Sequence, residues 1–266
     1  MSDRYAVIGN PVAHSRSPGI HAAFARATGQ AMTYERIEAP LDGFARTVAA
    51  FRAAGARGTN VTLPFKEEAF ALSDTLSARA RAAGAVNTLL FDADGIRGDN
   101  TDGVGLVRDL RDNLGVRLEG ARVLLLGAGG AARGVVAPLL EAGVASLRIA
   151  NRTASRALAL AQDQPRTRGG GFEDLGGEAF DIVVNATAAG MSGGMPPLPG
   201  GVFAPGALGY DMVYGRETPF LAFARAAGAR ASDGSGMLVE QAAESFFLWR
   251  GVRPDTAPVL AALRGG

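Results

Sequence analysis

Several residue types and segments are scarce or absent in this sequence of 266 residues. There is no cysteine, which excludes disulfides, thiol catalysis and thiolate metal sites. The two histidines, His14 and His21, are too few for most imidazole metal sites, so we expect no metal. No apolar run is long enough to span a bilayer, and the N-terminus does not resemble a signal peptide. These absences predict a cytoplasmic protein without a membrane partner.

Lysine is almost absent as well. Lys66 is the only lysine among the 27 lysine and arginine residues. A general bias towards arginine explains this if one lysine survived by chance. The chemical explanation is that a guanidinium stays protonated, whereas an amine can exchange a proton. Composition does not decide between the two explanations.

The overall composition is that of an ordinary globular protein. The chain is 47% hydrophobic and 20% charged, and it is long enough for one large or two modest domains. The net charge is +1, with acids and bases interspersed, so we expect no nucleic-acid partner.

Strand-like and helix-like segments alternate along the chain, which predicts an α/β fold. The predicted strands are 5–10, 33–39, 57–63, 85–92, 95–100, 121–130, 146–153, 180–187 and 207–214, with a hairpin joining 85–92 to 95–100. The predicted helices are 18–29, 41–56, 67–84, 103–115, 131–143, 218–229 and 236–251. We expect Gly29 to end the first helix, Asp42 to open the second and Ser73 to break the third. Residues 165–171 and 192–201 look like surface loops.

The layout predicts two domains. Residues 1–102 form an α/β substrate-binding domain, and 103–235 form a Rossmann-type, doubly wound, cofactor-binding domain. The helices in 236–266 have no strands of their own, so we expect them to pack back on the first domain. A chain that crosses twice leaves an interdomain cleft, which is a common ligand site.

A glycine-rich turn gives the cofactor signal. The segment LLLGAGGAARG joins a strand to a helix and places Gly127, Ala128, Gly129, Gly130 and Ala131 in the turn. Such a turn lets backbone amides and a helix N-terminus approach a pyrophosphate. The glycines alone are weak evidence, because any strand-to-helix turn can be glycine-rich.

The end of the following strand selects the cofactor. An NAD site needs a carboxylate there, but this strand ends in Asn151, Arg152 and Thr153, with Arg156 one turn later. Arginine binds a 2′-phosphate that a carboxylate would repel, so we predict NADP(H). The alternative is that Arg152 merely caps a surface turn.

Polar side chains gather in the first domain. Ser15 and Ser17 precede a helix and suit a carboxylate, although one of them alone would serve as a helix cap. Asn60 and Thr62 alternate on one strand and therefore share a face, and Asn87 lies near the start of another strand.

Lys66 and Asp102 both follow strands in this domain. Lys66 begins a helix, where the macrodipole disfavours positive charge, and a carboxylate partner would offset this. We expect Asp102 to be that partner, although it also suits a helix N-cap.

The last long helix carries a further candidate. Glu240 and Glu244, four residues apart, predict a solvent-facing stripe. Gln241 lies about 100° round from Glu240 and is either a flanking polar residue or a side chain aimed into the cleft.

These motifs together resemble the shikimate dehydrogenase family, over essentially the whole chain. The shared segments are GNPVAHSRSPGIH, GTNVTLPFKEEAF, GAVNTLL, GDNTDGVG, GAGGAARG, NRT, NATAAGM, TPFL and GMLVEQAA. The resemblance implies NADPH-dependent reduction of 3-dehydroshikimate to shikimate, in the biosynthesis of chorismate and aromatic amino acids. It implies Lys66 and Asp102 as the catalytic pair.

The resemblance also implies the ligand contacts. Ser15 and Ser17 would hold the substrate carboxylate, with Tyr214 near it. The ring hydroxyls would be bound by Thr62, Asn87, Asp102 and Gln241, and Asn60 is a further substrate-binding candidate. The adenosine phosphate would be bound by Asn151, Arg152 and Thr153. Thr187, Met191 and Met237 are candidates for the nicotinamide end, although a methionine is more often core filler.

Two rival interpretations remain open. A quinate/shikimate dehydrogenase would accept an added hydroxyl and often use NAD. A protein that senses NADP(H) without catalysis would explain the glycine turn, but it would not require Lys66 and Asp102. The sequence leaves open whether the protein is a monomer or a homodimer.

Overall fold

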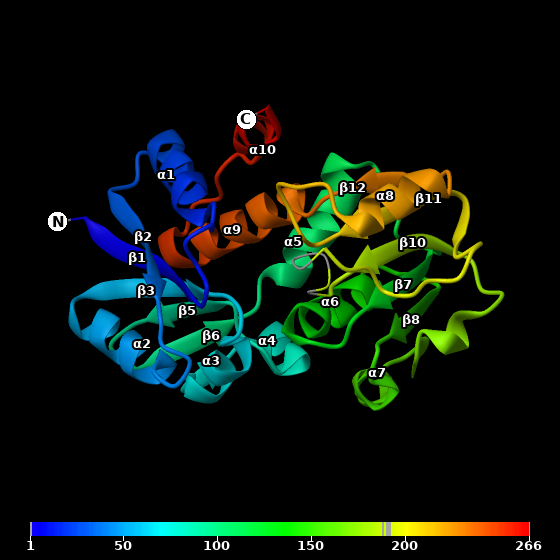
Figure 1. Cartoon of the computed structure of the whole chain (residues 1–266). Coiled ribbons are helices and arrows are strands. Elements are labelled where there is room, and N and C mark those ends of the chain that lie inside the picture. The colour runs from blue at the N-terminus through cyan, green and yellow to red at the C-terminus, as the bar shows by residue number, and fades with distance from the viewer. Residues whose placement is uncertain (1, 188, 190–192, 266) are drawn as a thin grey trace. The chain divides into compact units, whose positions relative to one another are not determined.

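The computed structural model describes residues 2–187, 189 and 193–265. The chain folds into two compact α/β units, Met1–Gly105 with Leu238–Gly266 (unit 1) and Leu106–Met237 (unit 2). The last helices therefore belong to the same unit as the first strands. Each unit has its own six-stranded sheet, and the expected fold class is confirmed (Figure 1).

The sheet of unit 1 is mixed, with strand order β2-β1-β3-β5-β6-β4. Its strands are β1 (Asp3–Gly9), β2 (Met32–Glu38), β3 (Ala56–Val61), β4 (Thr75–Leu76), β5 (Thr88–Phe91) and β6 (Ile96–Asp99). The first three are parallel, whereas β5 is antiparallel to both β3 and β6, so the predicted hairpin is confirmed. The short strand β4 was not predicted.

Six helices accompany this sheet in the described part of the chain. They are α1 (Ser17–Thr28), α2 (Phe44–Ala53), α3 (Lys66–Leu72), α4 (Ala78–Ala83), α9 (Ser235–Arg250) and α10 (Ala257–Gly265). As predicted, α1 ends at Gly29, which has the left-handed φ of 65° that glycine tolerates. The prediction that Asp42 opens α2 is wrong, because the helix starts after Gly43 without a side-chain cap. The predicted 67–84 helix breaks at Ser73 into α3 and α4, with β4 between them.

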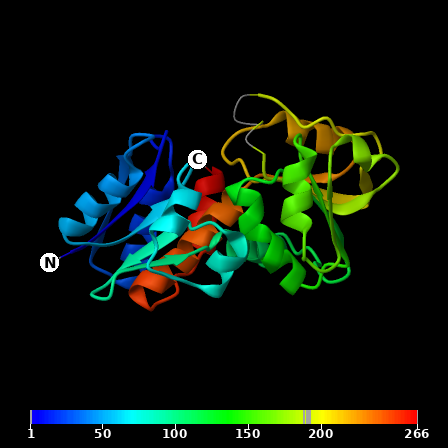
Figure 2. The same cartoon turned by 90° about the horizontal axis from the view of Figure 1, so that it is seen from below.

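Two apolar clusters hold unit 1 together, one on each face of its sheet. On one face, Phe44 of α2 stacks on Phe65, with ring centroids 4.9 Å apart, over Ile8 of β1. On the other face, α1, α9 and α10 pack around Phe24 and Phe246. Figures 1 and 2 both show α9 running along the strands of this unit. This packing brings residues near 240 beside residues near 60, 87 and 102.

The sheet of unit 2 is entirely parallel, with strand order β12-β11-β10-β7-β8-β9, as in a doubly wound Rossmann-type fold. Its strands are β7 (Arg122–Leu126), β8 (Ser146–Ala150), β9 (Thr167–Gly170), β10 (Phe180–Asn185), β11 (Phe203–Asp211) and β12 (Arg230–Ser232). Three predictions are corrected. Residues 165–171 contain an edge strand and not only a loop, β8 stops at Ala150, and β11 covers 203–211 instead of 207–214. Strand β12 was not predicted.

Helices cover both faces of this second sheet. They are α5 (Asp102–Arg108), a π-helical turn (Asp109–Asn113), α6 (Gly130–Glu141), α7 (Ala154–Ala161), a 3-10 turn (Glu173–Leu175) and α8 (Pro219–Ala226). Val123 and Leu125 of β7 face a cluster with α5 and α6, whereas Leu124 and Leu126 face a cluster with α8. Alternate side chains of β7 therefore pack against helices on opposite faces of the sheet, as expected for a central strand of a parallel sheet.

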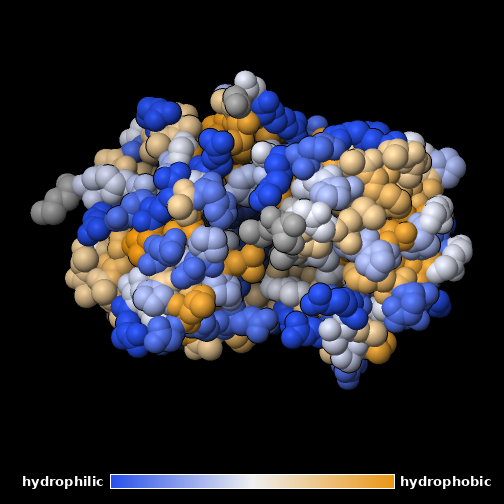
Figure 3. Space-filling view, in the orientation of Figure 1, coloured by the Kyte–Doolittle hydropathy of each residue, from blue (hydrophilic) through white to orange (hydrophobic). Residues whose placement is uncertain are grey.

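The surface carries few large apolar side chains. In the described residues the exposed ones are Leu41, Leu63, Leu158 and Phe247, which are spread along the chain. Figure 3 shows hydrophobic residues on the visible face in separate patches among hydrophilic ones. Among the described residues, no helix is both long enough and apolar enough to cross a membrane.

Candidate active site

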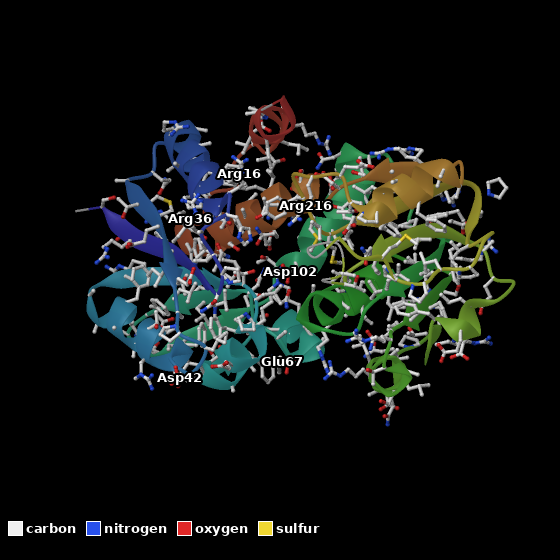
Figure 4. All side chains as sticks on the ribbon, viewed as in Figure 1. Arg16, Arg36, Asp42, Glu67, Asp102 and Arg216 are labelled. Carbon is white, nitrogen blue, oxygen red and sulfur yellow. The ribbon has the colours of Figure 1, made fainter. Side chains whose placement is uncertain are left out.

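Lys66 and Asp102 form a buried ion pair in unit 1. Lys66 is the first residue of α3, and Asp102 is the first residue of α5, where Figure 4 labels it. Lys66 Nζ donates a hydrogen bond to Asp102 Oδ2 at 2.6 Å. Their side chains are only 14% and 7% exposed. The expected meeting of the lone lysine with Asp102 is therefore present in the structure.

The Asp102 carboxylate is held on its other oxygen. Asn87 Nδ2 donates to Asp102 Oδ1 at 2.9 Å, while the Asp102 backbone N–H donates to Asn100 Oδ1 at 3.1 Å. One carboxylate oxygen thus faces the amide and the other faces the amine. This arrangement fixes the direction in which Asp102 presents its charge to Lys66.

Gln241 lies beside this carboxylate support. Its Oε1 is 3.4 Å from both Asn87 Nδ2 and Thr101 Oγ1, and its Nε2 donates to Leu238 O at 2.8 Å. Helix α9 therefore does return to the first strands and point Gln241 at Asn87. The interpretation of Gln241 as a mere flanking residue is not favoured.

The Asn60 amide has protein partners on both of its ends. Its Oδ1 accepts from Tyr34 at 2.7 Å, and its Nδ2 lies 3.0 Å from Ser245 Oγ and 3.2 Å from Thr88 Oγ1. Burial raises the pKa of the Tyr34 phenol well above its usual range, which keeps this donor protonated. Asn60 thus supports neighbouring groups, and its contact with substrate remains a prediction.

Ser15 and Ser17 are close together at the start of α1. Their hydroxyl oxygens are 3.2 Å apart, and the Ser17 N–H points at Ser15 Oγ at 3.3 Å. The Arg36 guanidinium, labelled in Figure 4, donates twice to the Ser15 carbonyl at 2.6 and 2.9 Å. The helix is capped by Arg16 without a side-chain bond, so two hydroxyls, a helix N-terminus and a guanidinium occur together. This combination suits an anion.

The remaining predicted substrate residues lie just after strands. Thr62 follows β3 and is half-buried, with its N–H bonded to Ile8 O. Tyr214 was expected to end a strand, but β11 stops at Asp211, so Tyr214 lies in the loop that follows in unit 2.

The glycine turn of unit 2 has the geometry expected of a pyrophosphate-binding loop. Gly127 follows β7 with φ of 107°, and a Cβ there would lie 3.1 Å from Ala186 O. Gly129 caps α6 and a Cβ there would meet nothing within 4 Å, so the helix N-terminus is open. Thr187, in the neighbouring turn, donates its hydroxyl to Asn185 at 2.7 Å. This turn fits the phosphates of a dinucleotide.

The loop after β8 presents two free cations. Asn151 Nδ2 closes the loop on Thr153 O at 3.0 Å. Arg152 and Arg156 are exposed, and within the described chain neither guanidinium has a hydrogen-bond or ion-pair partner. A free arginine pair at this position fits a 2′-phosphate, which agrees with the prediction of NADP(H).

Met191 and Met237 were the two methionines predicted to line the nicotinamide site. Met237 is buried in the apolar cluster of unit 2, which favours the core interpretation. Met191 lies outside the described residues.

The sequence analysis did not predict the three hydroxyl residues that support the site, and it placed two glutamates of α9 wrongly in solvent. Thr88, Thr101 and Ser245 bond to the Asn60 or Asn87 amides. The only sequence signal for Ser245 was its position one turn after Gln241. The predicted solvent stripe on α9 is wrong, because Glu240 and Glu244 are buried.

These glutamates have partners from distant parts of unit 1. Glu240 accepts from Thr256 at 2.7 Å. Glu244 pairs with Arg79 at 3.0 Å and also with Arg253, and Arg79 pairs with Asp99 at 2.6 Å. The glutamates therefore fasten α9 to α4, β6 and the segment before α10.

The sequence matches the family models of one enzyme family along most of its length. Residues 7–89 match the family model of the shikimate dehydrogenase substrate binding domain, 109–192 that of shikimate/quinate 5-dehydrogenase, and 234–264 that of the shikimate 5′-dehydrogenase C-terminal domain. The shikimate dehydrogenase (NADP(+)) of Dechloromonas aromatica is 61% identical over 99% of this chain and 98% of its own length.

Solved structures agree with these matches. The Thermus thermophilus shikimate 5-dehydrogenase, crystallised with NADP(H) and shikimate, has a TM-score of 0.88 at 38% identity over 99% of both chains. A Pseudomonas putida Ael1 enzyme has a TM-score of 0.93 at 52% identity over 98% of both chains. On this evidence the chain belongs to the shikimate dehydrogenase family.

Proposed function

We propose that the protein catalyses the reversible, NADP-dependent interconversion of 3-dehydroshikimate and shikimate. Unit 1 binds the substrate and unit 2 binds NADP(H). The observation that carries this proposal is the 2.6 Å pair of Lys66 and Asp102, braced by Asn87 and Gln241, in a member of this family. A protein that only senses NADP(H) has no need of such a pair.

The chemistry follows from the groups of this pair. NADPH, when bound, supplies the hydride that adds to the ketone carbon. The Lys66 ammonium donates to the ketone oxygen, stabilises the negative charge that grows there and gives up a proton, which leaves an alcohol. In the reverse direction the neutral amine accepts the alcohol proton. The 2.6 Å hydrogen bond from Lys66 to Asp102 orients the amine for this transfer.

Substrate recognition uses the polar groups around the pair. Ser15 and Ser17 bind the carboxylate, supported by the adjacent helix N-terminus and the Arg36 guanidinium. The ring hydroxyls contact Thr62, Asn87, Asp102 and Gln241. Asn60 is a further candidate for substrate binding, and Tyr214 is a candidate near the carboxylate. The 2.9 Å bond from Asn87 to Asp102 supports this, since both side chains already point to one place.

Cofactor binding uses the glycine turn after β7 and the arginine-containing loop after β8. The amides of Gly127 to Ala131 receive the pyrophosphate, and Thr187 and Met191 are the proposed contacts at the nicotinamide end. Met237 packs in the apolar cluster of unit 2, so a contact from it is limited to the part of its side chain at the edge of that cluster. Asn151, Arg152, Thr153 and Arg156 bind the adenosine phosphate. The support is the open helix N-terminus at Gly129 and the free Arg152 and Arg156.

The deciding experiment measures turnover with shikimate and with quinate, each with NADP⁺ and with NAD⁺. The proposal expects efficient oxidation of shikimate with NADP⁺. Equal efficiency with quinate or with NAD⁺ would instead indicate a quinate/shikimate dehydrogenase, and no turnover with any pair would indicate a sensor.

Lys66→Arg tests the role of the amine directly. Arginine keeps the charge but cannot give up the proton, so kcat should fall by about 10²–10⁴-fold while the circular dichroism spectrum stays unchanged. Arg57→Lys, a change at an exposed residue of β3, serves as the control and should leave kcat unchanged. Near-normal turnover of Lys66→Arg would refute proton transfer by the amine.

Cytoplasmic location and a monomeric or homodimeric state are also proposals. Cell fractionation tests the first, and light scattering of the purified protein tests the second.

A further inference from the structure

Three buried hydroxyls lie behind the catalytic pair, from three separate parts of unit 1. Thr88 begins β5, Thr101 precedes α5, and Ser245 lies on α9. Ser245 Oγ is 2.8 Å from Thr88 Oγ1 and 3.2 Å from Thr101 Oγ1, and all three residues are 0% exposed. None of these hydroxyls is hydrogen-bonded to Lys66 Nζ or to the Asp102 carboxylate, whose side-chain partners among the described residues are each other and Asn87.

The two threonines fix the orientation of the Asn87 amide. Asn87 Oδ1 accepts from Thr88 Oγ1 and from the Thr101 N–H, both at 2.9 Å. Its Nδ2 therefore faces the other way, with one N–H to Thr101 Oγ1 and one to Asp102 Oδ1, both at 2.9 Å. A flipped amide would set two acceptor oxygens against each other, so this orientation is required to hold Asp102.

Ser245 joins these groups to one another. Its Oγ lies within hydrogen-bonding distance of both Thr88 and Thr101, as the Asn87 amide also does, and it accepts from Asn60 Nδ2 at 3.0 Å. Because Thr88 gives its proton to Asn87 Oδ1, Ser245 is the donor of the 2.8 Å bond to Thr88, and Gln241 O at 3.1 Å is the alternative acceptor for that proton. Without its oxygen, each threonine hydroxyl loses one of the partners that hold it against Asn87. In a buried network, the direction of each hydroxyl depends on its neighbours.

We propose that Ser245 is a positioning residue for the reaction. Through Thr88 and Thr101 its hydroxyl fixes the Asn87 amide, which in turn holds Asp102 for Lys66. This inference rests on the proposed function and deepens it, because it makes helix α9 part of the support of the catalytic pair.

Ser245→Ala tests the inference by kinetics. The variant should fold, since Asn60 Nδ2 keeps Asn87 O and Thr88 Oγ1 as acceptors at 3.2 Å. We expect kcat for shikimate oxidation to fall about tenfold, because a small misplacement of catalytic groups is costly, while KM for NADP⁺ is unchanged. The control is Thr59→Val, which removes another buried hydroxyl of unit 1, one bonded only to the backbone oxygens of Ala6 and Asn60. It should leave kcat unchanged.

The single lysine supplies a second measurement that does not need turnover. Acetic anhydride at fixed pH labels Lys66 and the N-terminal amine, and peptide mass spectrometry separates the two. We expect Lys66 to be labelled several times faster in Ser245→Ala than in the wild type, because a loosened Asp102 leaves the amine unpaired for longer. Thr59→Val should label at the wild-type rate.

The outcomes separate the two claims. Wild-type kcat and wild-type labelling in Ser245→Ala overturn the positioning role, as do equal changes in Thr59→Val. If the wild-type protein itself fails to oxidise shikimate, the proposed function is refuted, and the labelling rates alone then decide whether Ser245 positions the pair.

Discussion

His21 makes the stability of unit 1 depend on pH. Its ring lies on α1, is 0% exposed, and stacks on Tyr34 with ring centroids 4.2 Å apart. Within the described residues, neither ring nitrogen has a hydrogen-bond partner. Burial lowers the pKa of His21 from its ordinary 6.5 to about 3, because a charged ring in this apolar cluster would lose its hydration.

The magnitude follows from the two pKa values. Near neutral pH the ring is neutral in both states, so its contribution to folding is fully present above about 6.5. Between 6.5 and 3 the unfolded chain binds a proton that the folded chain excludes, so stability falls as pH falls. At pH 5.0 the loss is about 1.4 × 1.5, or about 2 kcal/mol, relative to pH 7.5.

Urea unfolding measures this directly. Trp249 is the only tryptophan and its ring lies 5.4 Å from His21, so its fluorescence reports the unfolding of unit 1. His21→Phe keeps an aromatic ring but removes the titration, and the free energy of unfolding should then change about 2 kcal/mol less between pH 7.5 and 5.0 than in the wild type. The control is His14→Ala, at the exposed second histidine, which should keep the wild-type slope. Identical slopes in His21→Phe and the wild type would refute the reasoning.

The proposed catalytic pair, the loop that carries Arg152 and the ion pairs of Arg79 each give a further prediction. Asp102→Asn should lower kcat by about 10²–10⁴-fold in steady-state shikimate oxidation, because Lys66 loses its carboxylate partner, and a loss under about tenfold would contradict this. Arg152→Ala should raise KM for NADP⁺ by about 10–100-fold without changing KM for NAD⁺, and parallel changes in both would contradict 2′-phosphate binding. Arg79→Met should lower the free energy of unfolding by about 3 kcal/mol, because Arg79 is only 26% exposed and both Asp99 and Glu244 lose a partner. A urea midpoint equal to that of the wild type would contradict this last prediction.

Much of the fold could be predicted from the sequence because local patterns decide it. In the central strand β7, residues 123–126 form a continuous apolar run that leads into a glycine turn, and Gly29 ends α1 as expected. Strand β9 was read as a loop because its sequence, TRGG, has no strand pattern. It forms because Gly169 has no side chain. A Cβ there would lie 2.3 Å from Ala157 O of α7, so only glycine lets the helix approach this closely.

The candidate site was predicted in part. Lys66 and Asp102 could be paired because each stands out chemically, as a lone lysine and as an acid after a strand. Thr88, Thr101 and Ser245 could not, because hydroxyls are common and their partners come from distant segments. Glu244 was misread for a related reason. The four-residue spacing of Glu240 and Glu244 on one helix is typical of a solvent-facing stripe. The arginines that pair with Glu244, Arg79 and Arg253, come from other elements, and a pattern within one helix does not reveal them.

Unit 1 is built from both ends of the chain, and this has a consequence for biosynthesis. The ribosome makes Lys66 and Asp102 early, but Gln241 and Ser245 belong to a helix that emerges only after the whole of unit 2. A nascent or prematurely terminated polypeptide therefore contains the reactive amine without the residues that brace its partner. Removal of the tail by a protease after Met237 should silence the enzyme, while every proposed substrate contact within the first 105 residues stays in the chain.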